Sequence, residues 1–91
     1  MEQITPTYVR HLREKRREAE EAVYRARAEE YRLYLLRDRT AHGVVAAMRA
    51  AEAVVELERL ATNARIEAIT AQGILDTQSF PPFQKVVDRG Q

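Results

Sequence analysis

The sequence predicts an all-α protein in which two long helices fold back on each other as an antiparallel helical hairpin or coiled coil. Segments 6–39 and 44–72 are of similar length and rich in good helix formers, and a proline occurs only at the first position of the first segment. Apolar and small residues recur in both segments at alternating spacings of three and four, the repeat of helices that pack side by side. The alternative is one long helix, continuous or kinked.

The first helix is expected to follow a polar lead, residues 1–5. Thr5 is a good N-cap residue, and Pro6 suits the first helical position because the amide hydrogen that it lacks would have no partner there. Opposite charges four residues apart, such as Arg17 and Glu21, favour a helical, solvated side. These features place the first helix at about 6–39.

The second helix is expected to span about 44–72 and to stop at Gly73, a residue type suited to the left-handed position after a helix. Two consecutive prolines further along cannot continue a helix. Residues 74–91 are therefore predicted to form a short, irregular and extended tail rich in proline and aromatic residues. The helical coiled-coil domain is placed at 6–73.

The connection 40–43 decides between the hairpin and the single helix. A helix over the whole of 6–72 would be about 100 Å long, far longer than the helices of ordinary domains. Asp38 or Thr40 could cap a second helix, although the three-four spacing passes through the connection unbroken. The substitution Gly43→Ala separates the two. It should stabilise a continuous helix by up to about 1 kcal/mol, but should destabilise a left-handed turn at that residue.

A narrow seam of mostly small apolar side chains is expected to hold an oligomer together. The seam consists of two series of positions seven residues apart, which start at Ala19 and at Ala22. Small side chains allow helices to approach closely, but each buries little area. The predicted oligomer interface consists of Ala19, Ala22, Ala26, Leu33, Leu36, Ala47, Ala50, Val54, Leu57, Ala61 and Ala64.

A second apolar stripe lies roughly opposite the seam. In the first helix it contains Tyr24, Ala28, Tyr31 and Leu35, and in the second helix Val44, Met48, Ala51 and Val55 widen the apolar arc. A helix with two apolar faces usually has more than one neighbour, and tyrosine is favoured at interfaces. We interpret Tyr24, Tyr31 and Leu35 as partner-binding residues; the alternative is that a neighbour within the same bundle covers them.

The tail contains a second candidate for partner binding. In Phe80-Pro81-Pro82-Phe83, two aromatic rings flank a stiff diproline. A docking peptide would insert these rings into another subunit, whereas a structural tail would fold them onto its own helices. We expect another protein to be bound through this segment.

An arginine cluster near the N-terminus is the candidate nucleic-acid site. It comprises Arg10, Arg13, Arg16 and Arg17, whose guanidinium groups could follow phosphates. Glutamates at positions 14, 18, 20 and 21 lie among or just after them and neutralise much of their charge, and the net charge of the chain is only +1. A solvated helical face is therefore favoured over nucleic-acid binding.

The sequence argues against an enzyme. It contains no cysteine, which excludes disulfides, thiolate metal sites and cysteine catalysis. Its two histidines lie far apart, and no glycine-rich phosphate loop, nucleophile elbow or HExxH motif occurs. We expect no catalytic residue, no metal and no cofactor. The absence of an apolar signal core and of a long apolar run predicts a cytoplasmic protein without a membrane partner.

These patterns favour a non-enzymatic helical interaction protein. We expect a small oligomerising adaptor, scaffold or structural subunit of a larger assembly, such as a virion, secretion or motor complex, which binds itself and another protein. The first alternative is a nucleic-acid-binding or regulatory hairpin that uses the arginine cluster. The second is an inhibitor that docks one helix into a partner's groove.

Overall fold

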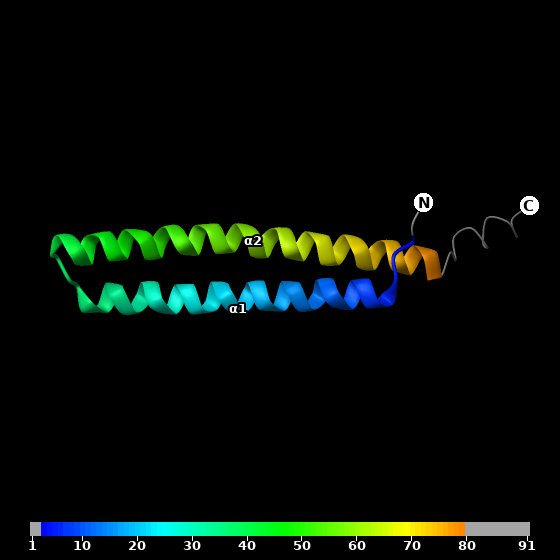
Figure 1. The fold of residues 1–91 in the computed structure, drawn as a ribbon, viewed down its shortest axis with the longest axis horizontal. Coiled ribbons are helices and arrows are strands. Elements are labelled where there is room, and N and C mark those ends of the chain that lie inside the picture. Colours follow the sequence, from blue (N-terminus) through cyan, green and yellow to red (C-terminus); the bar gives the residue numbers. More distant parts are fainter. Residues whose placement is uncertain (1–2, 80–91) are drawn as a thin grey trace, which may run out of the picture.

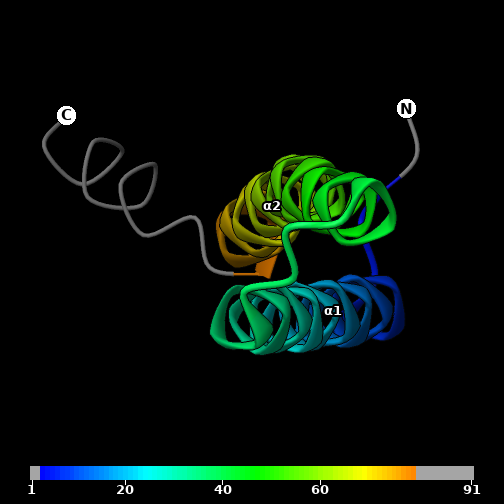
Figure 2. The same ribbon diagram turned by 90° about the vertical axis from the view of Figure 1, so that its left-hand side faces the viewer.

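A computed structural model describes residues 3–79 of the chain, which form two antiparallel helices joined by a short turn (Figure 1). Helix α1 spans Pro6–Leu36 and helix α2 spans Ala41–Ser79. The end-on view shows the two helices stacked on each other with their axes inclined (Figure 2). The all-α helical hairpin is confirmed, and the single long helix does not form.

Helix α1 begins as the sequence predicts. Thr5 has the extended backbone of an N-cap residue, with φ −102° and ψ 155°, and its hydroxyl accepts a hydrogen bond from the amide of Tyr8 at 3.1 Å. Pro6 occupies the first helical position. The cap satisfies one of the amides that would otherwise lack a partner at the start of the helix.

The turn is built from a left-handed residue followed by a cap. Arg37 has φ 50° and ψ 39°, and its amide donates to the carbonyl of Tyr34 at 3.2 Å. The Asp38 carboxylate accepts from the amide and the hydroxyl of Thr40, at 2.9 and 2.7 Å. The Thr40 hydroxyl in turn accepts from the amide of Gly43 at 3.1 Å and so caps α2.

The turn lies three residues earlier than expected. It occupies 37–40 instead of 40–43, because Arg37 takes the left-handed position that was expected at Gly43. Gly43 has a negative φ and belongs to the first turn of α2. Gly43 was expected either inside a continuous helix or in a left-handed turn. It is helical but lies against the turn, so neither expectation describes it.

Helix α2 continues through Gly73 instead of stopping there. Gly73 does not adopt a positive φ, and nothing lies within 4 Å of the position where its Cβ would be. The prediction of an extended tail from residue 74 is wrong for residues 74–79, which are helical. The proposed docking motif at 80–83 lies outside the described residues.

Contacts with the start of α1 explain why α2 extends beyond Gly73. Leu75 packs against a buried cluster that includes Val9 and Leu12. Next to it, the Gln78 side chain accepts from the amide of Ile4 at 3.0 Å and donates to the Ile4 carbonyl at 2.9 Å. These tertiary contacts outweigh the roughly 1 kcal/mol that a glycine costs inside a helix.

The core is a thin strip between the two helices. Its buried side chains are Val9, Leu12, Val23, Val54, Ala61, Ala64, Ala68 and Ala71. Along α2 this strip follows the predicted seam, since Val54, Ala61 and Ala64 are buried and Ala50 and Leu57 are half-buried. The seam is thus the contact between the two helices of one chain, and most of it is not available to a second copy while the hairpin is closed.

The predicted seam is only partly right. Ala19, Ala22, Ala26 and Leu33 are half-buried against α2, but Leu36 and Ala47 are exposed. The second row of buried positions in α1 runs through Val9 and Val23, and at the same spacing through the half-buried Arg16 and Glu30. Because these two residues are polar, the spacing of apolar residues does not reveal this row of buried positions. In addition, a count of sevens cannot be carried across a turn at which the chain reverses direction.

Neither helix of the described segment 3–79 has a stretch that is long and apolar enough to cross a membrane.

Candidate protein-interaction face

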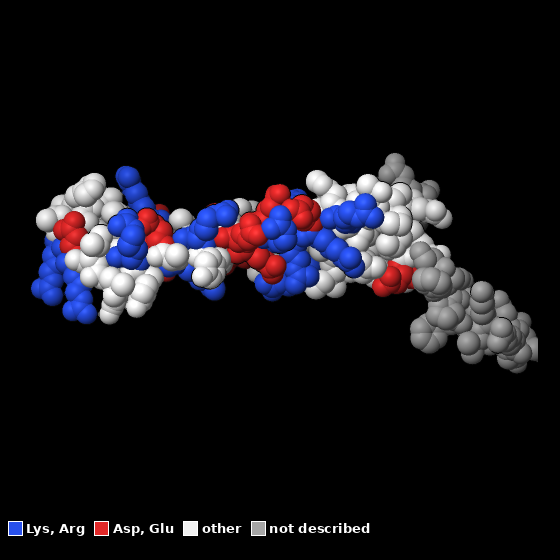
Figure 3. Space-filling model, turned by 90° about the horizontal axis from the view of Figure 1, so that it is seen from below, with Lys and Arg blue, Asp and Glu red and all other residues white. Residues whose placement is uncertain are grey.

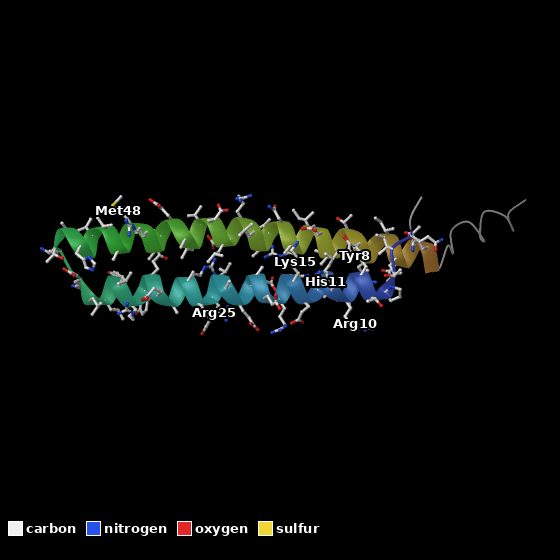
Figure 4. The ribbon with its side chains drawn as sticks, viewed as in Figure 1. Tyr8, Arg10, His11, Lys15, Arg25 and Met48 are labelled. Carbon is white, nitrogen blue, oxygen red and sulfur yellow. The ribbon has the colours of Figure 1, made fainter. Side chains whose placement is uncertain are left out.

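The hairpin is a flat pair of helices, and cross-helix polar contacts identify its two broad faces. On one face Glu20 lies 3.8 Å from Arg65, and further along Arg27 pairs with Glu58. On the other side Lys15 lies 3.8 Å from Glu67, and Figure 4 shows Lys15 between the two helices. Positions seven apart on a helix project in the same direction, so these pairs assign the remaining residues to a face.

The first broad face is apolar in the half of the hairpin nearer the turn. We call it the tyrosine face, defined by the exposed side chains of Tyr24, Tyr31, Tyr34, Val44, Met48 and Val55. Tyr24 is 77% exposed, Val55 67% and Tyr31 64%. Figure 4 shows Met48 projecting from α2 on the side that faces away from α1.

Two surface hollows show that both helices contribute to the tyrosine face. One hollow, of about 330 Å³, is lined by Tyr24 and Arg27 from α1 and by Glu58 and Thr62 from α2. The other is lined by Tyr34 from α1 and by Val44 and Met48 from α2, with Leu33 and Ala47 among the remaining lining residues. The face is therefore a shallow surface shared by two helices and not the stripe of a single one.

Tyr31 and Tyr34 form part of an ordered surface near the turn. The rings of Tyr31 and Tyr34 are stacked, with centroids 6.4 Å apart and planes inclined by 10°. The guanidinium of Arg37 lies 6.0 Å from the centroid of the Tyr34 ring. Such contacts favour one arrangement of large, exposed rings and so reduce the entropy that a partner's binding would cost.

The opposite broad face has a different composition. The exposed polar residues that project there comprise Glu18, Arg25 and Arg32 of α1 and Arg49, Glu56, Asn63 and Thr70 of α2. Exposed apolar side chains also occur there, since Leu36 is three heptads from Lys15 and Leu60 is one heptad from Glu67. We call this the polar face. Arg32 is paired with Glu29, and Arg59 at its edge is paired with Glu56. Hydrogen bonds from these arginines lower the pKa of Glu29 and of Glu56 below the ordinary value.

The sequence identified part of the tyrosine face. Tyr24 and Tyr31 lie on it, as expected for partner-binding residues, whereas Leu35 is 57% exposed on the outer edge of α1. Tyr34 was missed, and so was the fact that the stripe of the second helix lies beside the tyrosines. The sequence did not reveal which positions of α1 are buried. Those positions determine on which side of the hairpin each tyrosine lies.

The four candidate nucleic-acid arginines do not form one free basic surface. Arg17 pairs with Glu14 and Glu21, Arg16 lies 3.5 Å from Glu20, and Arg13 donates to the side chain of Gln72. Arg10 is exposed. Figure 3 shows acidic and basic side chains mixed over the middle of the hairpin.

The pairing of Arg17 with Glu14 also shifts the pKa values of both groups. The hydrogen bond from Arg17 lowers the pKa of Glu14, and the same contact raises the pKa of Arg17 above its ordinary value. Both shifts favour the charged pair, so this part of α1 presents compensated charges to solvent.

Within residues 3–79, no group of three or more His, Cys, Asp or Glu side chains is arranged to hold a metal ion. Comparison with protein families, with curated proteins and with solved structures gives no match to this chain. What can be said of its function therefore comes from the hairpin and its two unlike faces.

Proposed function

We propose that this chain is a non-enzymatic, helical protein-interaction protein: a small oligomerising adaptor, scaffold or structural subunit. The tyrosine face is the observation that supports the proposal. Monomeric proteins rarely expose a contiguous patch of large apolar side chains, and such patches mark sites of association. Tyrosine is also one of the residue types enriched at the energetically important centres of interfaces.

The position of the seam strengthens the assignment of the binding surface. The small side chains between α1 and α2 are used to close the hairpin, so they leave the outer faces to make contacts with other molecules. On the tyrosine face, three exposed tyrosines of α1 lie beside exposed apolar side chains of α2, whereas charged residues are frequent on the polar face. We therefore assign association to this face and solvent exposure to the polar face.

Sedimentation equilibrium over a micromolar concentration range tests the proposal. The average mass of the wild-type chain should rise with concentration, because association covers the tyrosine face. Tyr31→Asp and Met48→Asp place a charge in the apolar surface and should return the mass toward that of a monomer. Asn63→Asp adds the same charge on the polar face and serves as the matched control.

Circular dichroism of each variant checks that the hairpin is retained, since all three positions are exposed. A wild-type chain that stays monomeric at micromolar concentration would contradict the proposal. So would a control variant that dissociates as readily as the two variants of the tyrosine face, because association would then not depend on this surface.

We also propose that a different protein binds the segment 80–83. Affinity capture with the full chain, followed by mass identification, would name that partner. Replacing Phe80 and Phe83 with serine should abolish the capture but leave the sedimentation mass unchanged. Loss of both properties in the same variant would mean that the segment takes part in self-association instead.

Nucleic-acid binding is the rival outcome of these experiments. It predicts retention on heparin that weakens with salt and is lost when Arg10, Arg13 and Arg17 are replaced by alanine. The pairing of Arg17 with two glutamates and the hydrogen bond of Arg13 to Gln72 argue against it, and we expect the triple variant and the wild type to elute together.

A further inference from the structure

The two ends of the tyrosine face carry different charges. At the turn, the hollow that contains Tyr34 and Met48 is also lined by Arg37, Arg39 and Asp38, so two arginines outnumber one carboxylate there. At the inner end, the hollow beside Tyr24 is lined by the carboxylates of Glu20 and Glu58, which are paired with Arg65 and Arg27. The face is thus basic at one end, apolar in the middle and mixed in charge at the other end.

We propose that a second copy of this chain covers the tyrosine face with the opposite orientation, so that α1 packs on α1 and α2 on α2 in an antiparallel four-helix bundle. This inference rests on the proposed function and adds the identity and the orientation of the partner. A two-fold axis near Tyr31 would bring the face of each copy onto the same face of the other, as a symmetric dimer requires.

The area of the face suits such a dimer. Its six side chains expose on the order of 700 Å² in each copy, given the size of tyrosine and aliphatic side chains and their exposed fractions. Face-to-face contact could therefore bury up to about 1,400 Å² in total, and this limit falls within the range of specific, stable interfaces. The same face lies in one half of the hairpin, so the two copies overlap mainly through the halves that contain the turns.

Charge decides the orientation. With the two turns at the same end, Arg37 and Arg39 of one copy would meet the same arginines of the other, and like charges in contact oppose association. In the antiparallel arrangement these arginines lie above the segment of the second copy that contains Tyr24 and Glu58. There a guanidinium can stack on an aromatic ring and pair with a carboxylate.

Distance measurement between spin labels tests the orientation directly. The chain has no cysteine, so a single Thr70→Cys variant, on the polar face near the open end, accepts one label per copy. From the helical rise, the two labels should lie roughly 50 Å apart in the antiparallel dimer and less than about 30 Å apart in the parallel one.

The three outcomes separate this inference from the function on which it rests. A distance near the longer value supports the antiparallel dimer. A distance near the shorter value overturns the orientation but leaves self-association intact. A monomeric mass throughout the micromolar range, with no defined distance between labels, overturns both the inference and the proposed function.

Removal of charge gives an independent test with opposite signs for the two orientations. The double variant Arg37→Gln and Arg39→Gln should weaken dimerisation several-fold if the copies are antiparallel, because the guanidinium contacts with Tyr24 and Glu58 are lost. It should strengthen dimerisation if they are parallel, because the neutral side chains remove the repulsion between the turns. Arg25→Gln with Arg49→Gln makes the same change of net charge on the polar face and should leave the dissociation constant unchanged.

Discussion

Gly43 lies directly against the backbone of Asp38, and a Cβ on Gly43 would be 2.6 Å from the Asp38 carbonyl oxygen. Real Cβ atoms essentially never come so close to an oxygen, and the backbone at this point is held by the turn. The contact explains why a glycine occupies the first turn of α2 although its φ is negative. The requirement is for space and not for a left-handed conformation.

The substitution Gly43→Ala should therefore destabilise the hairpin, by about 1–3 kcal/mol, the usual cost of forcing an atom into a filled space. Thermal unfolding followed by circular dichroism measures this. Gly73→Ala is the matched control, because nothing lies within 4 Å of its Cβ position and alanine favours a helix. It should stabilise by up to about 1 kcal/mol. Equal effects of the two substitutions would contradict the contact.

Leu12→Ala should be far more damaging than Leu36→Ala. Leu12 is buried in the cluster at the open end, and removing a buried leucine side chain typically costs about 2–5 kcal/mol. Leu36 belongs to the seam inferred from the sequence but is 60% exposed, so its truncation should have a small effect. Chemical unfolding at a concentration where the chain is monomeric compares the two. A large effect at Leu36 and a small one at Leu12 would contradict this burial pattern and support the seam inferred from the sequence.

Asp38 should make the stability of the turn depend on acid pH. Hydrogen bonds from the amide and hydroxyl of Thr40 lower the pKa of Asp38 below its ordinary value of 3.8, so folding favours the ionised form. The resulting stabilisation is complete above the ordinary value and is lost as pH falls through the lowered one.

The variant Asp38→Asn removes this titration and isolates its effect. Its unfolding temperature should be lower than that of the wild type at neutral pH, and the difference should disappear in strong acid. Parallel curves for the two chains over the whole range would show that Asp38 does not contribute in this way.

Gln78→Ala should loosen the open end of the hairpin. The Gln78 side chain forms two hydrogen bonds with the backbone of Ile4, and these join the end of α2 to the segment before α1. Hydrogen exchange at the amide of Ile4 should become faster in the variant, whereas exchange in the middle of both helices should stay the same. Unchanged exchange at Ile4 would mean that neighbouring contacts, such as that of Leu75, are sufficient.

Local chemistry makes much of the architecture predictable from the sequence. Thr5 and Pro6 start α1 where the sequence places the start, and Thr40 caps α2 as one of the two expected residues. These features depend on side chains acting within a few residues of themselves, and such interactions are visible in a sequence. For the same reason the three-four repeat indicates the buried row of α2, where no polar residue interrupts it.

The differences arise where distant contacts override local preference. Glycine usually ends a helix, but α2 continues through Gly73 because Leu75 and Gln78 find partners at the start of α1. In the same way, the core register along α1 includes Arg16 and Glu30, which no pattern of apolar residues would include. Long charged side chains can occupy such positions because their stems cover apolar surface while their heads reach water.

Helix-forming composition was thus enough to indicate an all-α protein of two helical halves, with the hairpin favoured over a single long helix. The pairing of the two helices decided what the sequence left open: which side of α1 is buried, and that Tyr24, Tyr31 and Tyr34 share a face with Val44, Met48 and Val55. The physical reason is that a side chain's direction depends on its own helix alone. Whether that direction leads to solvent or to a neighbour depends on how the second helix is rotated and aligned against the first.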